Sequence, residues 1–433
     1  MIFATRNAHR LLSRFVSDRN GNIAIIFALA LVPLLSFVGA AVDYSLAARA
    51  RAKLIAALDT AVLVATAKSE ITKSASASQS DAINTFTGQM SALGLTTSSV
   101  TITVTDSVTT RTATGTATSA VTTYFMGILG YKTIAFTATS SAAASLPAYI
   151  DFYVLLDNSP SQGLGATTAD MTALQNATSD SCAFACHDTY TSSSKKTLQT
   201  NSYYSIAKKL GIKMRIDLVR DATQSLTDTA TASQLVSNQY RMAVYTMGSD
   251  CSSIGLSTIS ALSSSLSSVK TAVAGVDLMT IPYTNYNNDM CTDFDGTLSS
   301  MNSTIPTPGD GSSNSPQKWL FFVSDGVADY YYPSSCSQTV ISGGRCQEPL
   351  TTAVCDTIKA RGVKIAVLYT TYLAITNNSW YNTYISPWRS SIGTKMRTCA
   401  TSGYYYEVSS DASISDALNA LFQKAIAASH LTN

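Results

Sequence analysis

The feature that most constrains this chain is an uncharged apolar run near its N-terminus. Residues 23–42 read IAIIFALALVPLLSFVGAAV and hold no Asp, Glu, Lys or Arg. At 1.5 Å of rise per residue, a helix of this length covers about 30 Å, the thickness of a bilayer's hydrocarbon core. Pro33 is compatible with this interpretation, because proline is tolerated in membrane helices. The run is longer than the apolar core of a signal peptide, so the sequence favours an uncleaved anchor over cleavage within SFVGAAVDY.

The charges that flank this run predict its orientation. Arginines precede it at positions 6, 10, 14 and 19, and Asp43 follows it. The excess of positive charge predicts that residues 1–21 lie in the cytoplasm and that the rest of the chain lies outside it. Basic residues at positions 49, 51 and 53, after the run, reduce the difference in positive charge between its two sides.

The cysteines agree with that orientation. There are eight, and all follow residue 180: Cys182, Cys186, Cys251, Cys291, Cys336, Cys346, Cys355 and Cys399. An even number beyond the anchor favours disulfides in an oxidising compartment, with reduced thiols as the alternative. We expect the pairs Cys336–Cys346, Cys355–Cys399 and Cys251–Cys291, the last of which would brace the loop around Thr292.

Helical spacing continues past the apolar run. In residues 45–68 no Gly or Pro occurs, and apolar residues recur on one face. We expect one long helix that leaves the membrane and becomes amphipathic, with a bend at Asp43–Tyr44 as the alternative. Residues 70–148 alternate β-branched with small polar residues, which predicts half-buried strands in a small α+β module packed on that helix. A low-complexity stalk is the alternative.

The N-terminal segment resembles a known family. Residues 19–67 combine Arg-x-Gly before the apolar run, FALALVPLL within it, a Val-Asp-Tyr exit and ALDTAVLVATA beyond it. In this combination the segment is similar to TadE/TadG-like proteins of the bacterial tight-adherence (Flp) pilus machinery. The resemblance implies a role in assembling that pilus. It departs at Ile26, where type IV-like pilins carry Glu five positions after a processing glycine, so we expect no prepilin-type processing.

Strand-like and helix-like segments alternate from Tyr149 onward. The expected strands are residues 149–156, 240–247, 318–326, 363–371 and 403–410, and the expected helices are 205–230, 257–273, 350–362 and 413–429. Apolar strands that alternate with helices predict a doubly wound, mainly parallel α/β sheet covered on both faces. Ligands of such sheets bind at the carboxyl ends of the strands.

Oxygen-bearing side chains stand where two of these strands end. The first strand is followed by Asp-x-Ser-x-Ser, the third ends in Ser-Asp-Gly, and a Thr precedes a short helix in the loop CTDFDGTLSSM. This order is similar to the metal-ion-dependent adhesion site of von Willebrand factor A domains, which have a Rossmann-like fold. The resemblance spans residues 149–428 and implies five metal-site residues: Asp157, Ser159, Ser161, Thr292 and Asp325. It departs at Pro160 and Gln162, where the family has a glycine and often a Met.

The donor set suits a hard cation. Mg²⁺ prefers octahedral oxygen ligands and keeps waters where the protein supplies few ligands, and Mn²⁺ or Ca²⁺ are the alternatives. An open site of this kind would let an Asp or Glu of a protein partner complete the coordination. The alternative is a plain turn, in which Asp157 caps the next segment and the two serines shape the loop.

Other chemistries fit the sequence less well. A Ser-His-Asp hydrolase needs a histidine base, and only His187 is placed for it, since His9 and His430 lie near the termini. No Gly-x4-Gly-Lys-Ser/Thr loop occurs, which argues against an ATPase. Cys182 and Cys186 have three residues between them, where haem c attachment has two. We expect a small disulfide loop there; a periplasmic haem or redox protein that uses both cysteines and His187, or a zinc site, is the alternative.

These patterns together predict a non-enzymatic, single-pass protein of the bacterial inner membrane. Its N-terminus would be cytoplasmic and its bulk periplasmic or surface-exposed. It would bind a protein partner through Mg²⁺ and work with other pilus-assembly components; a general surface adhesin is an alternative. The net charge of +2 predicts no nucleic-acid partner. The expected segments are a tail (1–21), an anchor (22–43), a long helix plus α+β module (44–148) and a von Willebrand A-like domain (149–433) with an insertion (163–204).

Overall fold

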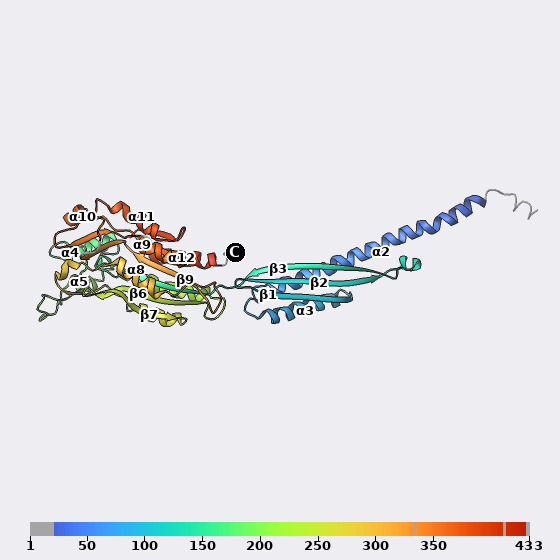
Figure 1. The fold of residues 1–433 in the computed structure, drawn as a ribbon, viewed down its shortest axis with the longest axis horizontal. Coiled ribbons are helices and arrows are strands. Elements are labelled where there is room, and N and C mark those ends of the chain that lie inside the picture. Colours follow the sequence, from blue (N-terminus) through green and yellow to red (C-terminus); the bar gives the residue numbers. More distant parts are fainter. Residues whose placement is uncertain (1–20, 332–334, 410–412, 430–433) are drawn as a thin grey trace, which may run out of the picture. The chain divides into compact units, whose positions relative to one another are not determined.

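The structure, a computed structural model, describes residues 21–331, 335–409 and 413–429. The predicted cytoplasmic tail therefore lies outside the described residues, apart from Gly21. The chain divides into two compact units, the N-terminal unit (Met1–Ser145) and the C-terminal unit (Leu146–Asn433). Figure 1 labels the helices and strands of both units.

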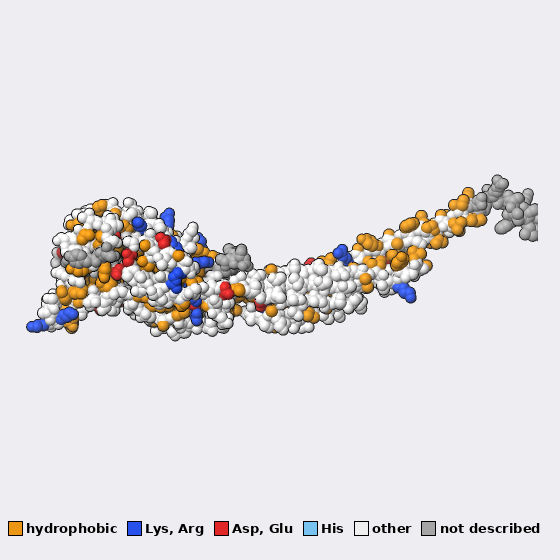
Figure 2. Space-filling view, viewed as in Figure 1, with side chains coloured by type: hydrophobic (Ala, Val, Ile, Leu, Met, Phe, Trp, Pro, Cys, Tyr) orange, Lys and Arg blue, Asp and Glu red, His pale blue; other side chains and the backbone are white. Residues whose placement is uncertain are grey.

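One helix dominates the N-terminal unit. Helix α2 (Gly21–Ala65) runs without interruption and includes Pro33, so the alternative of two separate helices that meet at Asp43–Tyr44 is wrong. Its segment from Ile23 is long and apolar enough to cross a membrane. Most apolar side chains of that segment are exposed, and they gather along the helix in Figure 2.

The rest of the N-terminal unit packs on the second half of α2. Helix α3 (Ala75–Ala92) precedes an antiparallel sheet of β1 (Thr97–Asp106), β2 (Thr110–Thr122) and β3 (Thr133–Ser145), in the order β1-β2-β3. Inward-facing residues of the strands and of α3 bury Leu54, Leu58 and Val62 of α2. A Cβ at Gly115 of β2 would lie 2.7 Å from Cδ1 of Leu58, so the sheet approaches the helix closely there. The predicted α+β module is confirmed.

The C-terminal unit is built on a six-stranded sheet. Its order is β13-β12-β9-β4-β6-β7, and each neighbouring pair is parallel except β6 with β7. The strands are β4 (Ile150–Leu156), β6 (Tyr240–Asp250), β7 (Ser253–Ser263), β9 (Gln317–Ser324), β12 (Lys364–Thr370) and β13 (Tyr405–Val408). When these six strands are numbered 1 to 6 in chain order and read from β7 to β13, the order is 3-2-1-4-5-6, which is that of a doubly wound fold. The predicted mainly parallel α/β fold is confirmed.

Helices cover both faces of this sheet. One hydrophobic cluster joins the sheet to α8 (Phe294–Thr304), α9 (Ala353–Ala360) and α11 (Arg389–Cys399), and a second joins it to α6 (Arg215–Ser233) and α12 (Ile414–Ser429). The central strands β4 and β9 are buried along almost their whole length, because they contact helices on both sides. Shorter elements of this unit are α4 (Thr168–Ala177), β5 (Asp188–Tyr190), α5 (Tyr203–Lys209), α7 (Leu266–Val273), β8 (Ile281–Tyr283), β10 (Val327–Tyr331), β11 (Arg345–Pro349) and α10 (Ser379–Tyr384).

Two helix predictions were wrong in part. The segment 257–273 is not one helix: its first part belongs to strand β7, and only α7 is helical. Ile254 and Leu256 alternate with small residues, a strand pattern, and pairing with β6 at the edge of the sheet outweighs the weak helical spacing of the serine-rich stretch. The expected helix 205–230 is divided between α5 and α6, with Gly211 in a left-handed conformation between them.

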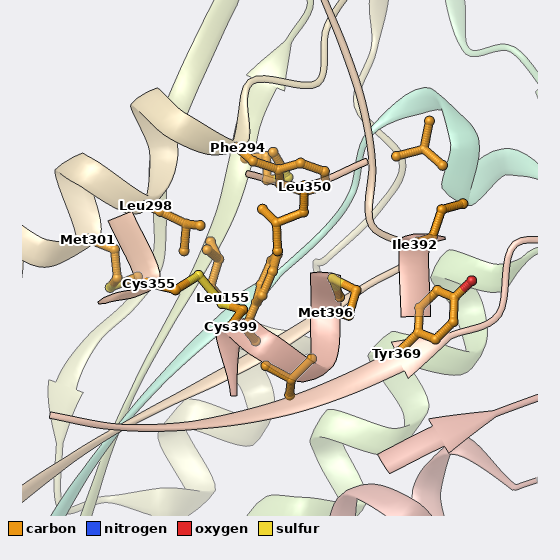
Figure 3. Packing of buried hydrophobic residues seen from close by; sticks show 14 of the residues in the cluster. Leu155, Phe294, Leu298, Met301, Leu350, Cys355, Tyr369, Ile392, Met396 and Cys399 are labelled. Carbon is orange, nitrogen blue, oxygen red and sulfur yellow. A yellow bond between two sulfur atoms is a disulfide. The ribbon is translucent and has the colours of Figure 1, made fainter. Parts of the chain in front are cut away.

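The three disulfides expected in addition to the Cys182–Cys186 pair are all present. Cys251–Cys291, Cys336–Cys346 and Cys355–Cys399 are bonded. Figure 3 shows the Cys355–Cys399 bond among buried side chains such as Leu298 and Met301. This bond joins α9 to α11 within the core on one face of the sheet.

Candidate functional site

The candidate site lies at the carboxyl ends of two adjacent strands, β4 and β9. These strands are parallel and in register, with Leu156 opposite Val323. Asp157 directly follows β4, and Asp325 directly follows β9. Both aspartates are almost fully buried, at 1% and 0% exposure. The sheet topology therefore brings together two carboxylates that are 168 positions apart in the sequence.

Hydrogen bonds orient the Asp157 carboxylate. Its Oδ1 accepts a bond from the backbone N–H of Ser159 at 3.0 Å, and its Oδ2 accepts one from the Ser324 hydroxyl at 2.6 Å. The next residue, Asn158, joins the end of β4 to β6: it accepts from the N–H of Met247 at 3.1 Å and donates to the carbonyl of Gly248 at 2.9 Å. Asp157 is therefore held by the residues that follow β4 and by the end of the neighbouring strand β9.

The two serines lie on a short 3₁₀ helix that begins at the strand end. Ser159 is its N-cap residue, and the helix spans Pro160–Gly163. The Ser159 and Ser161 hydroxyl oxygens are 3.1 Å apart. Pro160 occupies the first helical position, where no backbone donor is required and a fixed φ is favourable. The structure thus explains the proline at the position where the resemblance led us to expect glycine.

Several groups surround the Asp325 carboxylate. Its Oδ2 accepts a bond from Nε2 of Gln162 at 3.1 Å and lies 3.6 Å from Nη1 of Arg215, and its Oδ1 faces the N–H of Val327 at 3.3 Å. The next residue, Gly326, has a φ of +72°, and a Cβ there would lie 2.8 Å from Ile392 and Met396 atoms. The sharp turn after Asp325 therefore requires glycine.

The two carboxylates perturb each other. Burial, and then the nearby Asp157 charge, raise the pKa of Asp325 from 3.8 to about 7. Burial also raises the pKa of Asp157, against hydrogen bonds from Ser159 and Ser324 that lower it. Arg215 lowers both pKa values. If both aspartates are ionised, one guanidinium balances one of two negative charges, which leaves the site acidic.

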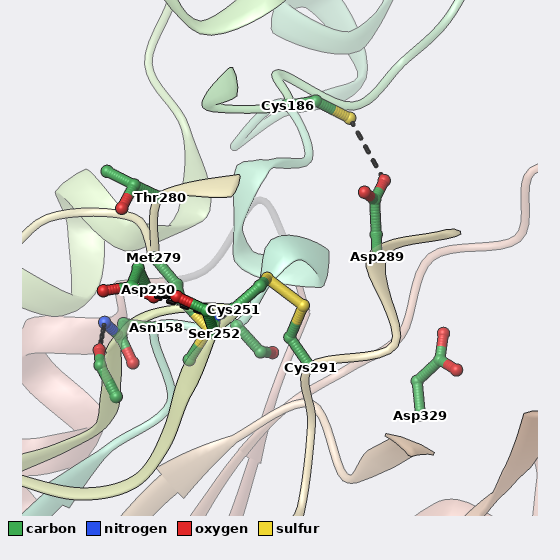
Figure 4. The surroundings of a disulfide bond; sticks show 12 residues. Asn158, Cys186, Asp250, Cys251, Ser252, Met279, Thr280, Asp289, Cys291 and Asp329 are labelled. Carbon is green, nitrogen blue, oxygen red and sulfur yellow. Dashed lines mark hydrogen bonds between the residues drawn. A yellow bond between two sulfur atoms is a disulfide. The ribbon is translucent and has the colours of Figure 1, made fainter. Parts of the chain in front are cut away.

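Thr292 reaches the same edge from a separate loop. Its backbone forms a two-way antiparallel bridge with Asp329 of β10, and the Cys251–Cys291 disulfide ties the preceding residue to the end of β6 (Figure 4). Thr292 is buried at 2% exposure. Of the five predicted residues, Ser161 and Thr292 line one cavity, whereas Asp157, Ser159 and Asp325 are not part of its lining.

That cavity has a volume of about 270 Å³ and is both aromatic and charged. Its walls include Asp329 and Arg345, which form a bidentate ion pair, and the Arg345 guanidinium lies over the Trp380 ring at 4.7 Å. Asp289 also lines it, and burial raises the pKa of this carboxyl to about 6. A side chain that reached Ser161 and Thr292 from solvent would pass along these walls.

The cysteine and histidine cluster does not form the expected arrangement. Cys182 and Cys186 are free thiols, so the predicted small disulfide loop is wrong. Figure 4 shows Cys186 directed at Asp289, with 3.7 Å between Sγ and Oδ2. The His187 ring instead stacks on Tyr204, with 3.8 Å between centroids. Cys186 and His187 therefore have different partners, although they are adjacent in the sequence.

Two site residues were missed by the sequence analysis. Gln162 was noted only as a departure from a family pattern, and Arg215 was read as an ordinary residue of a helix. Both are buried, at 0% and 4% exposure, and both contact Asp325. An arginine at the start of a helix, where acidic residues are favoured, is the one signal that could have drawn attention to Arg215.

The side chains at this edge fit a hard divalent cation. All five predicted residues offer oxygen, and two of them are buried carboxylates whose joint ionisation is unfavourable unless a cation compensates or one of them takes up a proton. Oε1 of Gln162 is buried and has no hydrogen-bond partner within the described residues, so one more oxygen is available beside Asp325.

The fold defines the class of the C-terminal unit. A six-stranded sheet in the order 3-2-1-4-5-6, with one antiparallel edge strand and helices on both faces, is a doubly wound, Rossmann-like fold, which is the architecture expected of a von Willebrand factor A-like domain. Residues 21–69 match the sequence model of a family described as "Putative Flp pilus-assembly TadE/G-like". The N-terminal segment of this chain is therefore TadE/G-like.

No curated protein matches the chain. Among solved structures, the vWF domain of the type V pili tip protein Mfa5 from Porphyromonas gingivalis is 10% identical, with a TM-score of 0.38, over 65% of this chain and 97% of that one. The pilus adhesin SpaC from Lactobacillus rhamnosus GG is 10% identical, with a TM-score of 0.33, over 76% and 34%. A mutant of the PilB minor pilin from Streptococcus sanguinis is 10% identical, with a TM-score of 0.31, over 77% and 78%.

Proposed function

We propose that this chain is a membrane-anchored component of tight-adherence (Flp) pilus assembly that binds a protein partner through a Mg²⁺-dependent site. The TadE/G-like match at residues 21–69 supports the pilus assignment. The exposed apolar part of α2 supports anchoring in the inner membrane, and the three disulfides support an extracytoplasmic C-terminal unit.

The observation that carries the metal proposal is the convergence of Asp157 and Asp325 at one buried edge. Burial, and then the like charge of Asp157, raise the pKa of Asp325, so the two carboxylates do not stabilise each other as charged groups. Asp157, Ser159, Ser161, Thr292 and Asp325 would hold the cation directly or through water. A bound Mg²⁺ would supply an open coordination position for a carboxylate of the partner.

The chain's own residues prepare this position. Ser324 and the Ser159 backbone hold Asp157, and Gln162 holds Asp325, so both carboxylates are oriented before any ligand arrives. The cavity beside Ser161 and Thr292 would hold residues of the partner that are adjacent to the partner's Asp or Glu. This role is one of binding, and we assign no catalytic residue.

Calorimetry on the full chain in detergent tests the metal site. We expect Mg²⁺ to bind the unmodified chain, and both Asp157→Asn and Asp325→Asn to abolish the binding heat. Asp228→Asn is the matched control, because that carboxylate is exposed and pairs only with Lys270. Equal binding by all four proteins would show that the site is elsewhere.

Piliation and surface attachment of cells test the role. Cells that carry Asp157→Asn should lose assembled pili or attachment, and cells that carry Asp228→Asn should keep both. If deletion of the gene leaves pili and attachment intact, the pilus role is wrong whatever the metal result.

A further inference from the structure

The turn between β2 and β3 is unusually apolar for an exposed loop. We call residues 123–132, TYFMGILGYK, the hairpin tip. Its exposed side chains are Tyr124 at 73%, Phe125 at 46%, Ile128 at 82%, Leu129 at 57% and Tyr131 at 65%. Turn sequences are normally dominated by Gly, Asn, Asp, Ser and Pro, and here only the two glycines fit that pattern. These large side chains thus face outward instead of completing the core of the N-terminal unit.

The hairpin tip is fixed to helix α2 by one carboxylate. Asp43 accepts hydrogen bonds from three consecutive backbone N–H groups: Oδ1 from Tyr124 at 2.9 Å, and Oδ2 from Phe125 at 2.9 Å and from Met126 at 2.7 Å. These groups begin the short 3₁₀ helix Met126–Leu129, whose first donors would otherwise be unpaired. Asp43 is buried at 1% exposure by this contact.

A glycine of α2 lets the tip approach the helix. A Cβ placed on Gly39 would lie 2.4 Å from Cβ of Phe125, so no larger residue fits without displacing the tip. Gly39 and Asp43 are one helical turn apart, about 6 Å along the axis. Both contacts therefore hold the tip at one level of α2.

That level is the end of the apolar run. Gly39 lies within residues 23–42, and Asp43 is the first charged residue after it. Side chains of the run are exposed up to this point, for example Phe37 at 77% and Val38 at 57%. Exposed apolar surface on the tip is therefore continuous with exposed apolar surface on the helix, where α2 would leave a bilayer. The hairpin and the apolar part of α2 can be followed in Figures 1 and 2.

We infer that the hairpin tip is a second membrane contact, which inserts Ile128 and Leu129 into the interface of the outer leaflet of the membrane that α2 spans. Tyr124 and Tyr131 would lie at the headgroup level, where tyrosines gather, and Lys132 is exposed toward lipid phosphates. Two points of contact fix the rotation of α2 about its axis and the height of the sheet above the bilayer, which one helix alone does not. This inference rests on the proposed membrane anchor.

Lipid is the occupant that the observations favour. The patch is continuous with the apolar run and mixes aliphatic, aromatic and basic side chains, as membrane-surface elements do. The opposite end of β2 offers an internal contrast. The turn between β1 and β2, Ser107 to Thr109, carries one exposed apolar residue, Val108 at 43%. The apolar cluster is thus specific to the end of the sheet beside the apolar run.

Depth-dependent fluorescence quenching on the full chain tests this inference. Three variants, Ile128→Trp, Val108→Trp and Val38→Trp, are reconstituted in phosphatidylcholine and phosphatidylglycerol vesicles with and without brominated acyl chains. The signal of the parent chain, whose Trp319, Trp380 and Trp388 all lie in the C-terminal unit, is subtracted. We expect bromine to quench the introduced tryptophan strongly in Ile128→Trp and in Val38→Trp, and to quench the Val108→Trp variant no more than the parent.

The three positions separate the possible failures. Val38 lies on the proposed span, so absence of quenching in Val38→Trp would show that α2 is not in the bilayer and would overturn the anchor itself. Quenching in Val38→Trp together with Ile128→Trp behaving like Val108→Trp would overturn the hairpin inference alone. That second result would indicate a protein, such as another copy of the chain, as the occupant of the tip.

Discussion

The two units of this chain each carry one feature that is unfavourable in water alone, and the features are opposite in kind. The N-terminal unit exposes large apolar side chains along α2 and at the hairpin tip. The C-terminal unit buries two carboxylates, Asp157 and Asp325, beside each other. Exposed apolar surface is compensated by lipid or protein, whereas buried like charge is compensated by a cation. The comparison indicates that each unit is made for a different partner.

The units also differ in how they are stabilised. The C-terminal unit has three disulfides and two hydrophobic clusters, one on each face of its sheet. The N-terminal unit contains no cysteine and packs one helix against three strands, with small residues such as Ala113 and Ala117 at the contact. It is stabilised by close packing and by hydrogen bonds and ion pairs such as that of the buried Arg111 with Asp106, without a covalent cross-link.

Reduction of the disulfides should produce the largest difference between the units. Each cross-link that is lost costs a domain about 2–5 kcal/mol of unfolding free energy. We expect dithiothreitol to destabilise the C-terminal unit strongly and to leave the N-terminal unit unchanged. Hydrogen exchange of peptides from both units, with and without reductant, measures this. Equal loss of protection in both units would contradict the separation of the chain at Ser145.

Leu58→Ala should produce the reverse pattern. Leu58 of α2 is fully buried against Gly115 of β2. Its truncation leaves a cavity and should lower the free energy of unfolding by about 2–5 kcal/mol. Thermal or denaturant unfolding, followed by the same exchange measurement, should show a destabilised N-terminal unit. The exposed Leu63, at 61%, provides the matched control Leu63→Ala, which should have little effect.

The buried carboxylates should make metal binding depend on pH. In the metal-free folded chain the pKa of Asp325 is about 7, above the ordinary value of 3.8. The folded state therefore holds a proton that the unfolded state has lost, so the contribution of Asp325 to stability falls as pH rises from about 4 to 7. Because Mg²⁺ must displace that proton, its affinity should rise about tenfold between pH 6 and pH 8.

Calorimetry at the two pH values checks this, with Asp228→Asn as a control that should keep the dependence. An affinity that does not change across this range would show that Asp325 is ionised well below pH 7 or does not contribute to the site.

Asp43→Ala should have the most local effect. It removes the acceptor of three backbone N–H groups of the hairpin tip, so amide exchange at residues 124–126 should become faster. Exchange within β2 should not change, because its ladder does not involve Asp43. Asp59→Ala, which removes a partner of Ser140 elsewhere on α2, is the comparison variant. Unchanged exchange at the tip would mean that Asp43 does not hold it.

Much of the fold could be predicted because the signals were local. The apolar run, the alternation in residues 97–122 and the strand at residues 149–156 each satisfy a periodic pattern within one segment. The edge strand β7 was missed, since its serine-rich sequence has weak local preference and its pairing with β6 decides its conformation.

The site could be predicted only as a set of residue types. Asp157 and Asp325 were visible as polar residues that end apolar strands. Arg215 and Gln162 were not, because nothing near them in the sequence shows that they face Asp325. The apolar hairpin tip was likewise read as a turn with aromatic residues, and its contact with Asp43 depends on 80 intervening residues.

The sequence by itself determined the apolar helix, most of the alternating strands and the α/β order, because hydrophobic periodicity and strand-end chemistry are properties of neighbouring residues. Only the tertiary structure decided that two carboxylates share one buried edge with an arginine, that Cys182 and Cys186 are free thiols, and that Asp43 holds an apolar loop at the end of the apolar run. These are consequences of burial and of distances between segments remote in the chain, which create the unbalanced charge and the exposed apolar surface from which a metal and a membrane can be inferred.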